Sequence, residues 1–154
     1  NEIILQALYI AAGFGQVAAS RASVSGAQGG CQAEIGVASA MAAAALTHIM
    51  GGTGEQCAHA FAIALGNLLG LVCDPVAGLV EIPCVKRNVI GAVNAVSAAD
   101  MALAGITSHI PADEVIDAMG EIGDAMPASL RETGQGGLAA TPTGRRIAES
   151  LPQG

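Results

Sequence analysis

The sequence has no tryptophan and very few other aromatic residues. Phe, Tyr and Trp make up 2% of its 154 residues, whereas hydrophobic residues as a class make up 52%. The apolar content is therefore mostly Ala, Val, Ile and Leu, beside 21 Gly. Ala and Leu favour helix, and small side chains let helices pack closely. We expect an all-α fold, with one compact helical domain over residues 1–154, about five to six helices, and Gly/Pro-rich connecting loops.

Positive charge is scarce as well, and long uninterrupted apolar runs are missing. Six Lys and Arg stand against 13 Asp and Glu, which gives a formal net charge of −7. This balance argues against a basic face for nucleic acid. The most apolar stretches, residues 36–50 and 58–72, contain polar residues and are short for a bilayer. The apolar first twenty residues carry Glu2 in place of the basic region of a signal peptide. We predict a cytoplasmic protein that binds neither nucleic acid nor membrane.

Gly, Pro and capping residues divide the chain into segments. Thr53 and Gln56 match a capping box, which predicts that a helix begins near Gly54. The predicted helices cover residues 2–19, 32–50, 54–72, 84–105, 111–126 and 142–151. The predicted loops are the Gly-, Ser- or Pro-rich segments 21–30, 73–83 and 128–141.

The four cysteines lack the C-x-x-C spacing of zinc ribbons and ferredoxins. In a reducing compartment they suggest metal or redox chemistry more than disulfides, although free Cys is also commonly a buried core residue. Cys31 and Cys84 precede or begin predicted helices, where free N–H groups and the helix dipole favour a thiolate. Cys73 opens the loop that Cys84 closes, while Cys57 lies inside a predicted helix. The residues alone predict a helical protein with a candidate three-cysteine metal site.

Four segments give a resemblance to a known family. They are GCQAEIG (30–36), GNLLGLVCDPVAGLVEIPC (66–84), KRNVIGAVNA (86–95) and GLAATPTGRRI (137–147). They closely resemble the alpha chain of iron–sulfur-dependent L-serine dehydratases, in which three cysteines hold a [4Fe–4S] cluster with one iron open. The resemblance implies that Cys31, Cys73 and Cys84 are the cluster ligands and that Cys57 is not. It also implies an L-serine ammonia-lyase, which converts L-serine to pyruvate and ammonia with the open iron as Lewis acid.

Five polar residues next to the cysteine motifs are candidates for substrate binding: Gln32, Asn67, Lys86, Arg87 and Asn88. The two cations could bind the substrate carboxylate or offset the charge of the cluster, and could equally be solvated surface residues. The three amides could bind substrate or only satisfy loop backbone.

The general base is not identified by the sequence. His48 and His59 lie in Ala-rich helices and fit structural roles better, and His109 lies on an apparent turn. The family's catalytic chain has an additional segment before this region and often a regulatory domain. We therefore expect a fragment or subunit whose partners are that missing N-terminal segment, a beta chain or a regulatory domain, within a homo- or hetero-oligomer. Two alternatives stay open: a cluster-dependent cysteine desulfidase, and a non-catalytic cluster-binding or interaction domain.

Overall fold

The computed structural model of the chain describes residues 1–151, and all of its regular elements are helices. Its α-helices are α1 (Glu2–Arg21), α2 (Gly26–Gly29), α3 (Val37–Ile49), α4 (Gly54–Gly66), α5 (Cys84–Leu103), α6 (Ala112–Ala125) and α7 (Pro142–Ser150). A π-helical turn, η1 (Gln32–Gly36), precedes α3, and 3-10 turns lie at η2 (Val76–Gly78), η3 (Ala128–Leu130) and η4 (Gly137–Ala140). Within residues 1–151 no strand forms, and an isolated bridge joins Cys73 to Arg131. The all-α prediction is confirmed.

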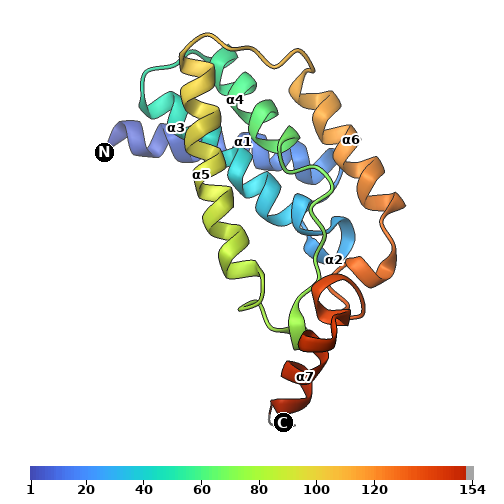
Figure 1. Ribbon diagram of the computed structural model, residues 1–154. Coiled ribbons are helices and arrows are strands. Elements are labelled where there is room, and N and C mark those ends of the chain that lie inside the picture. The colour runs from blue at the N-terminus through green and yellow to red at the C-terminus, as the bar shows by residue number, and fades with distance from the viewer. Residues whose placement is uncertain (152–154) are drawn as a thin grey trace.

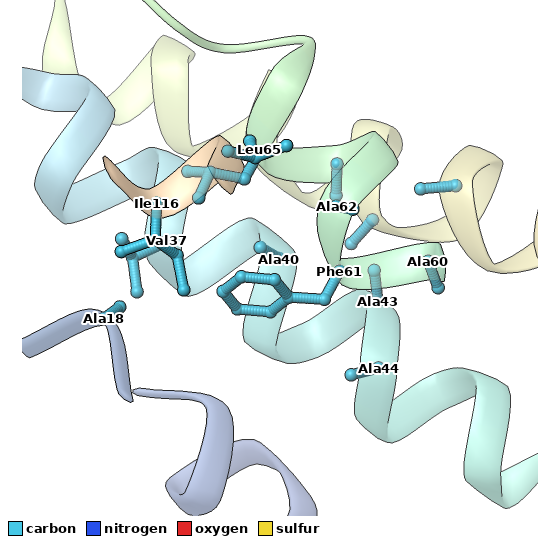
Figure 2. Packing of buried hydrophobic residues seen from close by; sticks show 14 of the residues in the cluster. Ala18, Val37, Ala40, Ala43, Ala44, Ala60, Phe61, Ala62, Leu65 and Ile116 are labelled. Carbon is cyan, nitrogen blue, oxygen red and sulfur yellow. The ribbon is translucent and has the colours of Figure 1, made fainter. Parts of the chain in front are cut away.

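The core consists largely of alanine. Helix α3 packs against α1, α4 and α5 (Figure 1). Its buried residues Ala40, Ala43 and Ala44 lie close to Phe61 of α4 (Figure 2). The Phe61 ring stacks on that of Phe14, with centroids 4.8 Å apart. Methyl groups at the contacts let the helix axes come close. Helices α3, α4 and α5 therefore pack densely, and this packing fixes the positions of the ends of α3 and α5.

The predicted start of α4 is confirmed, but its predicted end near Val72 is wrong. The Thr53 hydroxyl accepts a hydrogen bond from the Gln56 N–H (3.2 Å), and the Gln56 side chain accepts one from the Thr53 N–H (2.9 Å). The helix ends at Gly66 because the chain turns back through Gly70, whose φ is +82°. This turn brings the Leu71 carbonyl to the backbone N–H of Gln32, 2.9 Å away.

The remaining differences from the predicted elements are short. The predicted loop 21–30 contains α2, the predicted loop 73–83 contains the 3-10 turn η2, and the predicted loop 128–141 contains η3 and η4. The predicted helix over residues 32–50 opens with the π-helical turn η1. Wide turns of this type are common at functional sites, and this one begins directly after Cys31.

Helix α1 is long and apolar enough to cross a membrane by length and composition alone, and most of it is exposed. Core helices of other proteins and signal sequences have the same composition. One such helix therefore does not assign the chain to a membrane.

Candidate functional site

Three of the four cysteines line one cavity. Cys31, Cys73 and Cys84 surround a space of about 240 Å³ at the end of the bundle where α5 begins. A water molecule occupies about 30 Å³ in the liquid, so the cavity has room for a group of several atoms. The three residues are 1%, 3% and 9% exposed, so their thiols are shielded from bulk solvent.

Each thiol is fixed by backbone that belongs to a different segment. Cys31 directly precedes η1, and Cys84 is the first residue of α5. Cys73 lies in the loop, where its N–H donates to the Leu130 carbonyl and its carbonyl accepts from the Glu132 N–H, both at 2.8 Å. These two bonds tie the Cys73 loop to the C-terminal part of the chain.

Gly30 is required for the placement of Cys31. Its φ is +75°, and a Cβ there would lie 2.9 Å from the Leu71 carbonyl oxygen. That carbonyl accepts the Gln32 N–H, so its close approach fixes the backbone beside Cys31. A side chain at position 30 would push these two segments apart.

Cys57 lies apart from the cavity. It is 2% exposed within the main hydrophobic core, in α4 beside Ala60 and Phe61. Burial raises the pKa of the Cys57 thiol, as expected for a thiol that serves as a small apolar core residue.

Burial favours the neutral form of two of the cavity thiols, those of Cys73 and Cys84. Burial raises the pKa of the Cys73 thiol, and the adjacent Cys31 thiol adds to the rise through a hydrogen bond and its charge. Burial also raises the pKa of the Cys84 thiol, followed by the charge of Cys31, while Arg87 opposes the rise. From the sequence we expected the helix N-terminus to favour a thiolate at Cys84. Burial instead raises its pKa and favours the neutral thiol. A metal group that binds here must displace protons.

Arg87 is partly buried, and so it is not a solvated surface cation. Its Nη1 donates to Asp74 Oδ1 at 2.6 Å and to the Val72 carbonyl at 2.8 Å. Asp74 is 2% exposed, and its Oδ2 accepts the Leu138 N–H at 2.7 Å. Burial disfavours the charge of Arg87, but its bonds with Asp74 more than compensate and raise its pKa, with a contribution from Cys31. Arg87 therefore anchors the Cys73 loop and places positive charge beside the thiols.

Of the other four polar candidates, Asn88 alone lines the cavity. Its side-chain amide donates to the Cys84 carbonyl at 2.9 Å. Asn67 and Lys86 are exposed and are not part of the lining. Asn67 instead donates to the side chain of Asn94 at 2.8 Å.

Gln32 is fully buried and its amide is already satisfied. Its Nε2 donates to the Met119 carbonyl at 3.0 Å, and its Oε1 accepts the Gly70 N–H at 2.8 Å. The amide therefore joins η1 to α6 and to the turn after α4. This arrangement favours the structural alternative for Gln32 over substrate binding.

Two carboxylates in the cavity were not among the predicted site residues. A Cβ at Gly26 would lie 2.8 Å from Glu34 Oε2, 3.6 Å from Glu132 Oε2 and 3.5 Å from Cys73 Sγ, so these atoms converge on one point. Glu34 could have been found from the sequence, because it follows Cys31 by three residues and residues with this spacing lie on the same side of a helical turn. Glu132 could not, because 101 residues separate it from Cys31. None of the three histidines lines the cavity.

The donor set around the cavity suits a cysteine-ligated cluster. Among residues 1–151 no group of three Cys, His, Asp or Glu side chains is arranged to hold one metal ion. Three buried thiols line a space for several atoms, and soft sulfur donors suit iron–sulfur clusters.

A larger cavity of about 720 Å³ lies between α1, α2 and α6 but contains no cysteine. Arg21 and Asp117, which form an exposed ion pair of 2.5 Å, lie on its wall. Its size exceeds that of the cysteine cavity, but nothing in its lining matches the chemistry of the thiols. The smaller cavity is therefore the candidate site.

Comparison with known proteins shows the family of the chain. The sequence profile of the family described as "Serine dehydratase alpha chain" matches residues 2–139, a region that contains all three cavity cysteines. The chain belongs to the serine dehydratase alpha-chain family. It is 67% identical over 151 residues to the "Probable L-serine dehydratase, alpha chain" of Bacillus subtilis, which covers 98% of this chain and 50% of that protein.

Two further serine dehydratase alpha chains are similar to this chain. The "Probable L-serine dehydratase, alpha chain" of Latilactobacillus sakei is 67% identical over 137 residues, 89% of this chain and 66% of that protein. The "L-serine dehydratase, alpha chain" of Peptoniphilus asaccharolyticus is 58% identical over 135 residues, 88% of this chain and 46% of that protein. The chain thus spans about half to two thirds of the length of these curated relatives.

Proposed function

We propose that the protein containing this chain is an L-serine ammonia-lyase whose [4Fe–4S] cluster is held by Cys31, Cys73 and Cys84. The observation that carries the proposal is the convergence of three buried thiols, from three separate segments, on one cavity. Membership of the serine dehydratase alpha-chain family supports the substrate and the reaction.

The reaction removes the α-proton and the hydroxyl group of L-serine. The enamine that results would tautomerise and hydrolyse to pyruvate and ammonia. When bound, the cluster supplies an iron without a cysteine ligand, a Lewis acid that eases departure of the hydroxyl group.

The chain's own residues would hold the cluster and orient the substrate. Arg87, fixed by Asp74, offsets the negative charge of the three thiolates from within the protein. Glu34 and Glu132 present carboxylate oxygens beside Cys73, and an α-ammonium group is the part of serine that they can bind. The general base that removes the α-proton is one of these two carboxylates or a residue of the protein outside this chain.

The test is iron and sulfide analysis of the anaerobically purified protein, with an absorption spectrum and turnover of L-serine and L-cysteine. We expect about four irons per chain and pyruvate from L-serine. Single Cys→Ser changes at 31, 73 or 84 should remove iron and activity, because a hydroxyl is a poor ligand for this soft site.

Cys57→Ser is the matched control. It should keep the iron and lose only stability, on the order of 1–3 kcal/mol if the buried hydroxyl stays unpaired. Air should inactivate the wild-type enzyme, and ferrous iron with thiol should restore it. Activity in air that iron chelation leaves unchanged would refute the cluster, and turnover of L-cysteine in place of L-serine would refute the substrate.

A further inference from the structure

One side of α5 carries an exposed row of valines. Val85, Val89, Val93 and Val96 are 55%, 60%, 59% and 50% exposed. Their spacing of four, four and three residues puts them on one side of the helix. We call these four residues the α5 outer face.

The composition of this face does not suit contact with water. From Asn88 to Ala99 the helix carries no charged residue, whereas solvent-facing helix surfaces normally do. Valine is also a weaker helix former than Ala, Lys or Glu, so helix formation does not explain the choice. In the part of the chain that the structure describes, α5 packs against α3, α4 and η1, on its other side (Figure 1).

The α5 outer face is continuous with the rim of the cysteine cavity. Val85 belongs to both, and Val80, 63% exposed, lines the cavity beside it. A partner that covers the valine row therefore also reaches the opening above Cys84. Because Val85 belongs to the row and to the lining, such a partner is placed to complete the cavity.

We propose that the α5 outer face is the docking surface for the remaining part of the alpha chain, the part that curated relatives have beyond the region matched here. The Bacillus subtilis relative is about twice as long as the match. A segment joined to the same chain meets α5 at a high effective concentration, which favours it over a second copy of the protein. The docking rests on the exposed face and on family membership. Only its consequence, closure of the cavity over bound substrate, rests on the proposed function.

Photo-crosslinking in the product of the complete gene tests the proposal. Val89 and Val93 are replaced singly by p-benzoylphenylalanine, and Ser97, at the rim of the face, carries the probe if a bulky group at 93 prevents folding. The control position is Glu55 in the first turn of α4, whose side chain is 85% exposed. After irradiation, mass spectrometry identifies the residues joined to the probe.

We expect crosslinks within one chain, from positions 89 and 93 to residues outside the matched region, and none from position 55. The proposal would be overturned by crosslinks to α5 of a second copy or by crosslinks to a different polypeptide. Efficient activation of the probe that gives no crosslink would overturn it too. A complete gene product no longer than these 154 residues would overturn it as well. Since crosslinking needs neither cluster nor turnover, an inactive protein with the expected crosslinks would contradict the proposed function alone.

Discussion

The ion pair between Arg87 and Asp74 gives a sharp prediction for stability. Asp74→Asn keeps the size of the side chain but removes its charge, and leaves the Arg87 guanidinium without its partner in a mostly buried position. The Asp74 side chain is 3% exposed and that of Arg87 is 19% exposed. Breaking a buried pair from one side costs about 3–5 kcal/mol. We expect about 3 kcal/mol, the lower end, because Arg87 keeps some contact with water and the introduced amide oxygen can still accept one hydrogen bond.

Asp117→Asn is the matched control because it breaks the same kind of pair on the surface. Arg21 and Asp117 also form a short Arg–Asp contact, but their side chains are 41% and 45% exposed. The bond with Arg21 lowers the pKa of Asp117, yet water screens the interaction and replaces it when it is lost. The stability of the Asp117→Asn protein should therefore be indistinguishable from wild type.

Urea unfolding of the cofactor-free proteins at neutral pH, followed by circular dichroism, measures both changes. With a slope of about 2 kcal/mol per M, Asp74→Asn should lower the midpoint by roughly 1.5 M. Equal shifts for the two variants, or a larger one for Asp117→Asn, would show that burial does not control the strength of these pairs. Arg87 would then not be the anchor of the Cys73 loop.

Two further predictions concern the cavity. Glu132→Gln should raise the KM for L-serine roughly tenfold with iron content unchanged, because it removes one charged acceptor for the substrate ammonium group. Glu149→Gln on α7 is the control. An unchanged KM in the Glu132→Gln protein would show that Glu132 does not bind substrate. In the cofactor-free protein, burial and the Cys31 thiol raise the pKa of the Cys73 thiol above its ordinary 9.0, so the folded state keeps a proton that the unfolded state releases. The stabilisation that this proton gives should therefore be fully present below about pH 9 and be lost as pH rises above that value. The urea midpoint should fall between about pH 8 and pH 10, and it should fall less in Cys73→Ala than in wild type. An identical fall in both proteins would contradict the raised pKa.

Local sequence predicted the helices well where capping and composition agree. Thr53 and Gln56 form the expected capping box, and the Gly- and Pro-rich segment after Cys73 is a loop. The prediction failed for the end of α4, because apolar residues continue through Leu71 while the backbone already turns at Gly70. That turn is stabilised by a contact with Gln32, 38 residues away, which local propensity does not contain.

The sequence by itself determined the fold class and the identity of the candidate thiols. An Ala-rich chain with almost no aromatic residues forms closely packed helices, because small side chains leave little other way to bury apolar surface. The family resemblance singled out Cys31, Cys73 and Cys84 among the four cysteines. Their roles as ligands remain a prediction.

Only the tertiary structure decided which polar residues accompany those thiols. Lys86 and Arg87 are neighbours in sequence, yet one is exposed and the other is paired with Asp74, since successive residues on a helix point about 100° apart. Gln32 is next to Cys31, but its amide serves the backbone of α6 and of the turn after α4. Glu132 reaches the cavity through the pairing of its segment with Cys73. Contacts between segments this far apart depend on how the helices pack, and so they cannot be read from spacing along the chain.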